Sequence, residues 1–233
     1  MTSFLLKCIA LFSMVIDHVS LAYFKYTTIF NVLGRIAFPI FAYQISEGYS
    51  YTKNIKKYLL RLLLFAFISQ IPFNLFQSLF TDTYNLNIFF TLFLGLLAIC
   101  IYEKLDSYKN KNTNKYLYII NICSFILISV FCILAEICKL DYGFFGIAVI
   151  FLFHLFKKNK LRMNISFIFL ITIKYILDII TYGYHYLYIL LFLGTISSLI
   201  FINLYTGKQG KKTKYLLYLF YPIHLFLLYI LFR

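Results

Sequence analysis

The feature that most constrains the fold of this chain is a succession of apolar runs, each long enough to cross a membrane. A membrane-spanning helix needs about 20 mostly apolar residues, and 62% of the 233 residues are hydrophobic while only 13% are charged. We therefore expect residues 1–233 to form one integral-membrane domain, an all-α polytopic helical bundle of about nine spans. The expected spans are residues 4–24, 29–49, 58–80, 86–102, 116–135, 142–156, 164–182, 186–203 and 215–232.

The distribution of positive charge predicts the orientation of the bundle. Of the 22 Lys and Arg residues, 17 fall on one side of the expected spans and three on the other, with Arg35 and Lys174 inside spans. The positive-inside rule then places the N-terminus in the cytoplasm and the C-terminus outside, in a multi-pass protein of the inner (cytoplasmic) cell membrane. The loops expected in the cytoplasm are those around Lys56, Lys111, Lys158 and Lys212.

The same distribution assigns the net charge of +14 to contacts with the lipid bilayer, and no nucleic-acid partner is expected. The five cysteines form neither a CxxC pair nor a Cys/His cluster at metal spacing, so no metal site is expected. The first apolar run is of spanning length and lacks a small-residue cleavage site, so no cleavable signal peptide is expected.

Polar side chains interrupt the first two spans at depths that a bilayer penalises. Asp17, His18, Arg35 and Glu47 stand among Leu, Ile, Phe, Val and Ala residues, and each charge near the centre of a membrane helix costs about 2.5–3.5 kcal/mol on insertion scales. Such groups mark candidate functional sites. For Arg35 the alternative is a structural ion pair with Asp17 that neutralises both.

His18 is the candidate general base, because a neutral imidazole can accept a proton near physiological pH. Lys7 precedes it by eleven residues, which places both on one face of a helix and about 16 Å apart along its axis. Asp17 points about 100° away and is expected to orient groups on a neighbouring helix. The structural alternative is a histidine that is simply hydrogen-bonded inside the bundle.

Further polar residues follow in the outer half of later spans. We expect them to converge with Asp17, His18 and Arg35 in one water-accessible cavity, because polar groups at this depth must face one another or water. Asp141 could instead cap a helix, and His224, near the midplane, could instead bond a carbonyl freed by Pro222. The residues expected to bind the acceptor substrate are Gln70, Asn74, Asn87, Asp141, Tyr142 and His224.

Several motifs carry a resemblance that periodicity alone could not give. DH at residue 17, GRIAFP at 34, SEGY at 46, SQIPF at 69, DYG at 141 and FYPIH at 220 occur in order along nearly the whole chain. The sequence resembles the TraX family, membrane proteins associated with N-terminal acetylation of conjugative F-type pilin. It is also similar to the wider group of integral-membrane acyltransferases, whose first helix carries a basic residue, ten intervening residues and a His, as Lys7 and His18 do here.

The resemblance implies transfer of an acyl group from acetyl-CoA to an amine or hydroxyl of an envelope-associated acceptor, either a pilin-like peptide or a glycan. His18 would be the base, Arg35 or Asn87 would stabilise the oxyanion, and Asp17 would position these groups. The residues expected to hold CoA at the cytoplasmic mouth are Lys7, Glu47, Lys53, Lys56 and Lys57.

Two other functions remain open at this stage. A transporter also needs intramembrane charges and proline-broken helices, although no repeat is evident between the halves and the number of spans is odd. A non-catalytic assembly factor of a conjugation or secretion apparatus is the third possibility.

Overall fold

The computed structural model describes residues 1–109, 117–211 and 215–233, and these are almost entirely helical. Five of the helices, α1, α4, α5, α8 and α9, are long and apolar enough to cross a membrane. The predicted polytopic helical bundle is therefore confirmed, and the chain is a membrane protein. The helices are α1 (Ser3–Phe24), α2 (Phe30–Gly34), α3 (Ala37–Tyr51), α4 (Ile55–Gln77), α5 (Ile88–Lys109), α6 (Leu117–Ile137), α7 (Gly143–Leu155), α8 (Lys160–Tyr182), α9 (Tyr186–Asn203) and α10 (Leu216–Phe232).

The second predicted span is broken into α2 and α3 at Arg35 and Ile36. Pro39 explains the break, because a proline ring clashes with the carbonyl four residues earlier and has no N–H to bond it. At the third position of α3, however, proline lies in a first turn whose N–H groups have no intrahelical partner. The break leaves Arg35 between the two helices.

Short polar side chains begin three of the long helices. The Thr2 hydroxyl accepts a hydrogen bond from the backbone of Leu5 at the start of α1. Asn54 accepts from Lys57 N at 2.9 Å at the start of α4, and Asn159 accepts from Arg162 N at 3.0 Å at the start of α8. These N-caps satisfy backbone donors that have no partner inside the helix.

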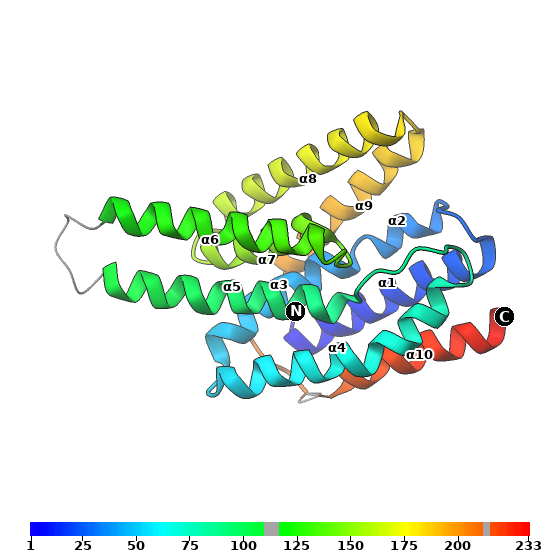
Figure 1. Ribbon diagram of the computed structural model, residues 1–233, viewed down its shortest axis with the longest axis horizontal. Coiled ribbons are helices and arrows are strands. Elements are labelled where there is room, and N and C mark those ends of the chain that lie inside the picture. Colours follow the sequence, from blue (N-terminus) through cyan, green and yellow to red (C-terminus); the bar gives the residue numbers. More distant parts are fainter. Residues whose placement is uncertain (110–116, 212–214) are drawn as a thin grey trace.

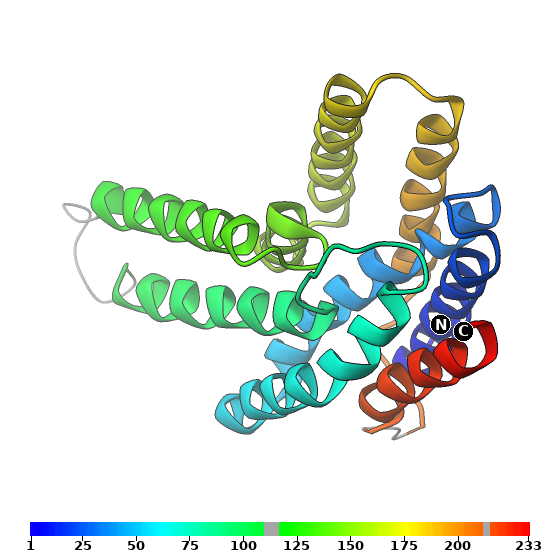
Figure 2. The same ribbon diagram turned by 45° about the vertical axis from the view of Figure 1, so that its right-hand side comes forward.

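The bundle is assembled around α3, which packs against α1, α5, α7 and α9. The α5–α6 and α8–α9 hairpins extend from this centre as two arms (Figures 1 and 2), while α10 packs mainly on α4 and also on α1. The largest fully buried side chains include Phe38, Phe89, Phe153 and Phe167, so the core lies where α3, α5, α7 and α8 meet.

Hydrogen bonds gather several of the basic segments at one end of the bundle. Lys157 Nζ donates to Ser50 Oγ at 3.1 Å, Lys160 Nζ donates to the Asn203 carbonyl at 3.0 Å, and the Lys208 carbonyl accepts from Ser3 N at 2.8 Å. We call this the basic end. Its cytoplasmic location stays a prediction, and the loops at Lys111 and Lys212 lie outside the described residues.

Candidate functional site

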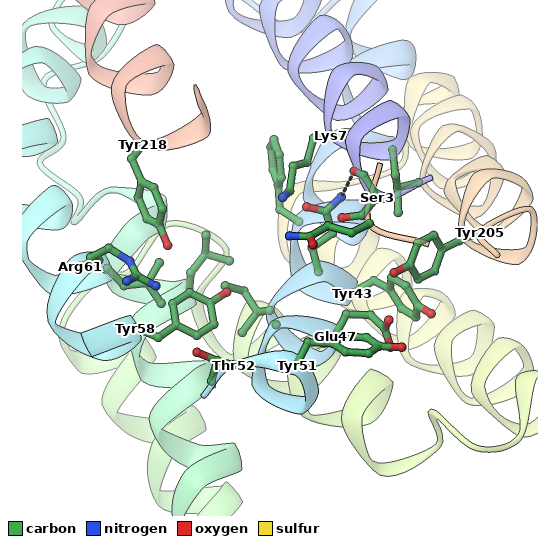
Figure 3. Close-up of a pocket in the computed structure, with 18 of the residues that line it drawn as sticks. Ser3, Lys7, Tyr43, Glu47, Tyr51, Thr52, Tyr58, Arg61, Tyr205 and Tyr218 are labelled. Atoms are coloured by element: carbon green, nitrogen blue, oxygen red, sulfur yellow. Dashed lines mark hydrogen bonds between the residues drawn. The ribbon is translucent and has the colours of Figure 1, made fainter. Parts of the chain in front are cut away.

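A cavity of about 560 Å³ opens at the basic end of the bundle. Residues of α1 and α3 line one side, α4 and α10 line the other, and Phe89 and Leu92 of α5 form the inner wall. Figure 3 shows Lys7 and Ser3 across the cavity from Arg61, Tyr58 and Tyr218. We call it the basic cavity, because the cationic side chains of Lys7, Arg61 and Lys211 line it.

The loop after α9 is fixed over the start of α1 and forms one wall of the basic cavity. The carbonyls of Lys208 and Gln209 accept hydrogen bonds from Ser3 N at 2.8 Å and Phe4 N at 3.2 Å. Gly210 has a φ of +70°, and a Cβ there would lie 2.8 Å from Thr2 Oγ1, so only glycine fits this close approach. The contacts bring Lys211 to the same mouth as Lys7.

Glu47 provides the carboxylate in the wall of the basic cavity. Tyr205 lines the same cavity, and burial together with the charge of Glu47 raises the pKa of Tyr205 to about 12. The phenol therefore keeps its proton at neutral pH and is able to donate it to the carboxylate. Lys7 and Glu47, two of the residues expected to hold CoA, thus line the same cavity.

Arg61 is a cavity residue that the sequence analysis counted only as a topology signal. Its guanidinium lies 5.6 Å from the centre of the Tyr58 ring, and its Nε is buried without a hydrogen-bond partner. The spacing of Tyr58, Arg61 and Leu62 along α4 could have revealed it, because residues three and four positions apart share a helix face.

Lys53, Lys56 and Lys57 do not line the basic cavity, which corrects the expectation that they join Lys7 there. All three are exposed. Lys53 precedes the N-cap Asn54. Lys56 and Lys57 lie in the first turn of α4, one turn before Arg61. Their charge is available to lipid headgroups.

Aromatic rings connect the inner wall of the basic cavity with His18. The Phe89 ring stacks on Tyr218 with centroids 5.8 Å apart and meets the edge of Tyr221 at 5.3 Å. Tyr221 in turn lies 6.4 Å from the His18 ring and 5.6 Å from that of His224. His18 itself lines neither this cavity nor the smaller one described below.

His18 and His224 form a direct pair between the first and last helices. Nδ1 of His18 lies 2.7 Å from Nε2 of His224, and the two rings are stacked at 5.0 Å with 7° between their planes. Nδ1 of His224 lies 2.9 Å from the Phe220 carbonyl. Pro222 would free the carbonyl of Tyr218 rather than that of Phe220, so the predicted alternative for His224 identified the wrong carbonyl and missed His18 as a partner.

Asp17 faces the α2–α3 break and not the histidine pair, as its position on the helix predicts. Asn31 Nδ2 donates to Asp17 Oδ1 at 2.8 Å, and Arg35 Nη2 lies 3.8 Å from the same oxygen. A Cβ on Gly34 would lie 2.3 Å from Asp17 Oδ1, so glycine is needed for this approach. The predicted Asp17–Arg35 ion pair is confirmed.

Arg35 also lines a second cavity of about 150 Å³, which lies between α3, α7, α8 and α9. Lys174 and Asp178 line it and form an ion pair one helical turn apart. The Tyr142 ring also lines it and stacks on Phe38 with centroids 3.9 Å apart.

Gln70, Asn74 and Asn87 bond one another instead of facing a cavity. Asn87 Nδ2 donates to Gln70 Oε1 at 2.8 Å and to the Ala66 carbonyl at 2.7 Å, and its Oδ1 accepts from Phe89 N at 3.0 Å. Gln70 Nε2 donates to Asn74 Oδ1 at 2.7 Å. These amides join α4 to the start of α5, which leaves Asn87 no free donor for an oxyanion.

Asp141 lies in the turn before α7, where its backbone N–H donates to the Leu86 carbonyl at 2.8 Å and its carbonyl accepts from the Thr91 hydroxyl. Its carboxylate does not cap α7, because Glu136 accepts from Phe144 N at 2.6 Å in that role. The expected single cavity is therefore not what the structure shows. The polar residues divide into the histidine pair, the Asp17 cluster, the amide cluster and this turn.

Comparison with known proteins assigns almost the whole chain to one family. The family model described as TraX protein matches residues 3–232. "Probable fimbrial assembly protein FimC, serogroup H1" of Dichelobacter nodosus is 28% identical over 97% of this chain and 94% of its own length. "Uncharacterized protein RP591" of Rickettsia prowazekii (strain Madrid E) is 33% identical over 39% of this chain and 34% of its own length. No solved structure matches the chain significantly. The chain belongs to the TraX family.

Proposed function

We propose that this protein is a membrane-embedded acyltransferase that takes an acetyl group from acetyl-CoA and passes it to an amine or hydroxyl of an acceptor in the cell envelope. The observation that carries the proposal is the connection between the basic cavity and the His18–His224 pair. Phe89, in the inner wall of the cavity, contacts Tyr221, and the Tyr221 ring lies against His18. Membership of the TraX family supports the same reaction class.

The basic cavity suits the nucleotide part of the donor. Its volume of about 560 Å³ falls within the range of about 300–1,000 Å³ that is typical of small-molecule and cofactor sites. CoA carries a diphosphate and a 3′-phosphate, and Lys7, Arg61 and Lys211 are cations placed around one mouth. The rings of Tyr58 and Tyr218 are available to pack on the adenine.

The distance along α1 suits the rest of the donor. Lys7 and His18 are separated by about 16 Å of helix, which a pantetheine arm can cover. Phe89 and Tyr221 lie between the cavity and the histidine pair. In our proposal these two rings turn aside when the arm enters, and they exclude water from the thioester when it is in place.

His18 then acts as the general base. It removes a proton from the acceptor amine or hydroxyl while that atom attacks the thioester carbonyl. The tetrahedral intermediate collapses with cleavage of the C–S bond, and the departing CoA sulfur takes up the proton held by His18. The products are the acetylated acceptor and the free CoA thiol, and His18 returns to its starting state without any further reactant.

The acceptor in this proposal is a pilin-like peptide N-terminus or an envelope glycan, reached in the inner membrane. A second candidate is a non-catalytic assembly role, which the name of the Dichelobacter nodosus relative favours. Incubation of the purified protein in detergent with acetyl-labelled acetyl-CoA separates the two. An acyltransferase slowly hydrolyses or exchanges the acetyl group in the absence of its acceptor, whereas an assembly factor leaves acetyl-CoA intact.

A further inference from the structure

We propose that His224 is a positioning residue that fixes the tautomer of His18, so that Nε2 of His18 is the basic nitrogen of the site. The inference rests on the proposed acyl transfer for its catalytic meaning. Its structural part, the placement of one proton, follows from the contacts of the pair alone.

The Phe220 carbonyl sets the direction of the chain of hydrogen bonds. A carbonyl oxygen can only accept, so the contact of 2.9 Å between it and Nδ1 of His224 requires the proton on that nitrogen. In a neutral imidazole the other nitrogen is then an acceptor. Nε2 of His224 therefore offers its lone pair to His18.

His18 must supply the proton of the next hydrogen bond. At 2.7 Å from Nε2 of His224, Nδ1 of His18 carries the shared hydrogen. The remaining nitrogen of His18, Nε2, is left without a proton. None of the described residues hydrogen-bonds this nitrogen, so its lone pair is not engaged inside the bundle.

The alternative arrangement would need a charged pair. If His224 were an imidazolium, its Nε2 could donate to His18, but the pair would then carry a positive charge inside the bundle. A charge at membrane depth requires a partner of opposite sign. Asp17, the acid next to His18 in sequence, is already engaged with Asn31 and Arg35. The neutral pair with the proton on Nδ1 of His18 is the arrangement that the surroundings support.

Packing holds His224 in the orientation that this role requires. Its ring stacks on Phe220 with centroids 5.0 Å apart and 16° between the planes, and Tyr221 meets it at 5.6 Å. Phe76 of α4 packs against His18 at 5.1 Å. Both rings are thus fixed by neighbours from α4 and α10, in the way that an orienting group fixes the base of a catalytic triad.

The arrangement also stabilises the charged state of His18. When Nε2 of His18 takes the proton of the acceptor, the hydrogen on Nδ1 stays on His18, and Nε2 of His224 accepts a hydrogen bond from the imidazolium. Release of the proton from Nε2 of His18 to the CoA sulfur returns the pair to its starting state.

Two amide variants separate this role from a merely structural one, because they keep one hydrogen bond each. In His224→Gln the side-chain oxygen reaches the place of Nε2 and can accept from His18. In His224→Asn the shorter amide reaches only the place of Nδ1 and can donate only to the Phe220 carbonyl. We expect kcat to fall less than about 10-fold in H224Q and on the order of 10²-fold in H224N, within the range of general-base effects, with the KM for acetyl-CoA unchanged in both.

Nitrogen NMR of histidine-labelled protein in micelles provides the readout that does not depend on activity. The signals of His18 are assigned by their loss in His18→Gln. We expect a protonated Nδ1 and an unprotonated Nε2 in the wild-type protein and in H224Q, and a mixture of tautomers in H224N. A proton on Nε2 of His18 in the wild-type protein, or activity kept by H224N and lost by H224Q, would overturn the inference. If the protein shows no acetyl transfer at all, the proposed function fails while the NMR result still decides the tautomer.

Discussion

Replacing Arg61 by alanine tests most clearly whether the donor binds in the basic cavity or is attracted by the exposed positive charge around it. The guanidinium is half-buried, lies over the Tyr58 ring at 5.6 Å, and has a buried Nε without a partner. Arg61 lines the basic cavity, so its guanidinium can bind a phosphate there. A hydrogen bond to a charged group contributes about 1.5–3 kcal/mol, which corresponds to a loss of about 10- to 150-fold in affinity for the donor.

The assay is the KM for acetyl-CoA, together with direct binding of CoA to the purified protein in micelles. Removing a contact made equally in the ground and transition states raises KM and leaves kcat unchanged. Lys57→Ala is the matched control, because it removes one positive charge from the same helix at an exposed position outside the cavity, and we expect a change below about two-fold.

Equal effects of Arg61→Ala and Lys57→Ala would refute this reasoning, since they would mean that diffuse charge and not the cavity attracts the donor. Size-exclusion profiles and thermal midpoints of both variants show whether the fold is intact. A loss of folding confined to Arg61→Ala is resolved by Arg61→Lys, which keeps the charge and is expected to recover part of the affinity.

Three further predictions follow from the same structure. Gly34→Ala should lower stability by about 1–3 kcal/mol, the usual cost of overpacking, because the new Cβ would lie 2.3 Å from Asp17 Oδ1; an unchanged thermal midpoint would show that the α2–α3 break is not tightly packed. Asn87→Leu should destabilise the protein by about 1–3 kcal/mol, because it removes the side-chain donor to the Gln70 and Ala66 oxygens and leaves the buried Phe89 N–H without its acceptor, yet turnover per folded molecule should stay within a few-fold; a selective loss of kcat would restore Asn87 as a catalytic candidate. Reporter fusions after Lys111 and after Arg233 should report opposite sides of the membrane, and the same side for both would contradict the expected topology.

The helical class could be predicted from the sequence because it depends on long-range averages. Apolar runs of spanning length leave few alternatives once backbone groups must be satisfied without water. The break in the second span was harder to predict. Pro39 is compatible with the first turn of a new helix but not with the interior of a continuous one, so it indicates a break just before it. The close approach of Asp17 to Gly34 beside the break is a contact between distant segments that the sequence does not reveal.

Pairs of polar residues were predictable where helix geometry alone decides them, as for Lys174 and Asp178, or where one charge needed another, as for Asp17 and Arg35. Convergence from distant spans was not predictable in the same way. His18 and His224 are 206 positions apart, and nothing local in either motif says that α10 returns to α1. The expected grouping of all polar residues in one cavity was wrong because small clusters satisfy one another more locally.

The residues of the basic cavity show a similar limit. Lys7 was identified through its spacing from His18, which is a property of one helix. Arg61 and Lys211 reach the same cavity from α4 and from the loop after α9, and in the sequence they are two of many basic residues on one side. Their selection depends on the N-cap at Asn54 and on the loop contacts around Gly210, which only the folded chain reveals.

The most direct test of the central claim is the release of CoA from acetyl-CoA by purified protein, measured for the wild type and for His18→Ala with donor binding followed in parallel. The account predicts slow hydrolysis or exchange by the wild-type protein, loss of turnover in His18→Ala, and donor binding within a few-fold of the wild type, because Lys7 and Arg61 hold the donor at the other end of the site. Equal rates in the two proteins, or an intact thioester in both while CoA still binds, would contradict an acyltransferase centred on His18.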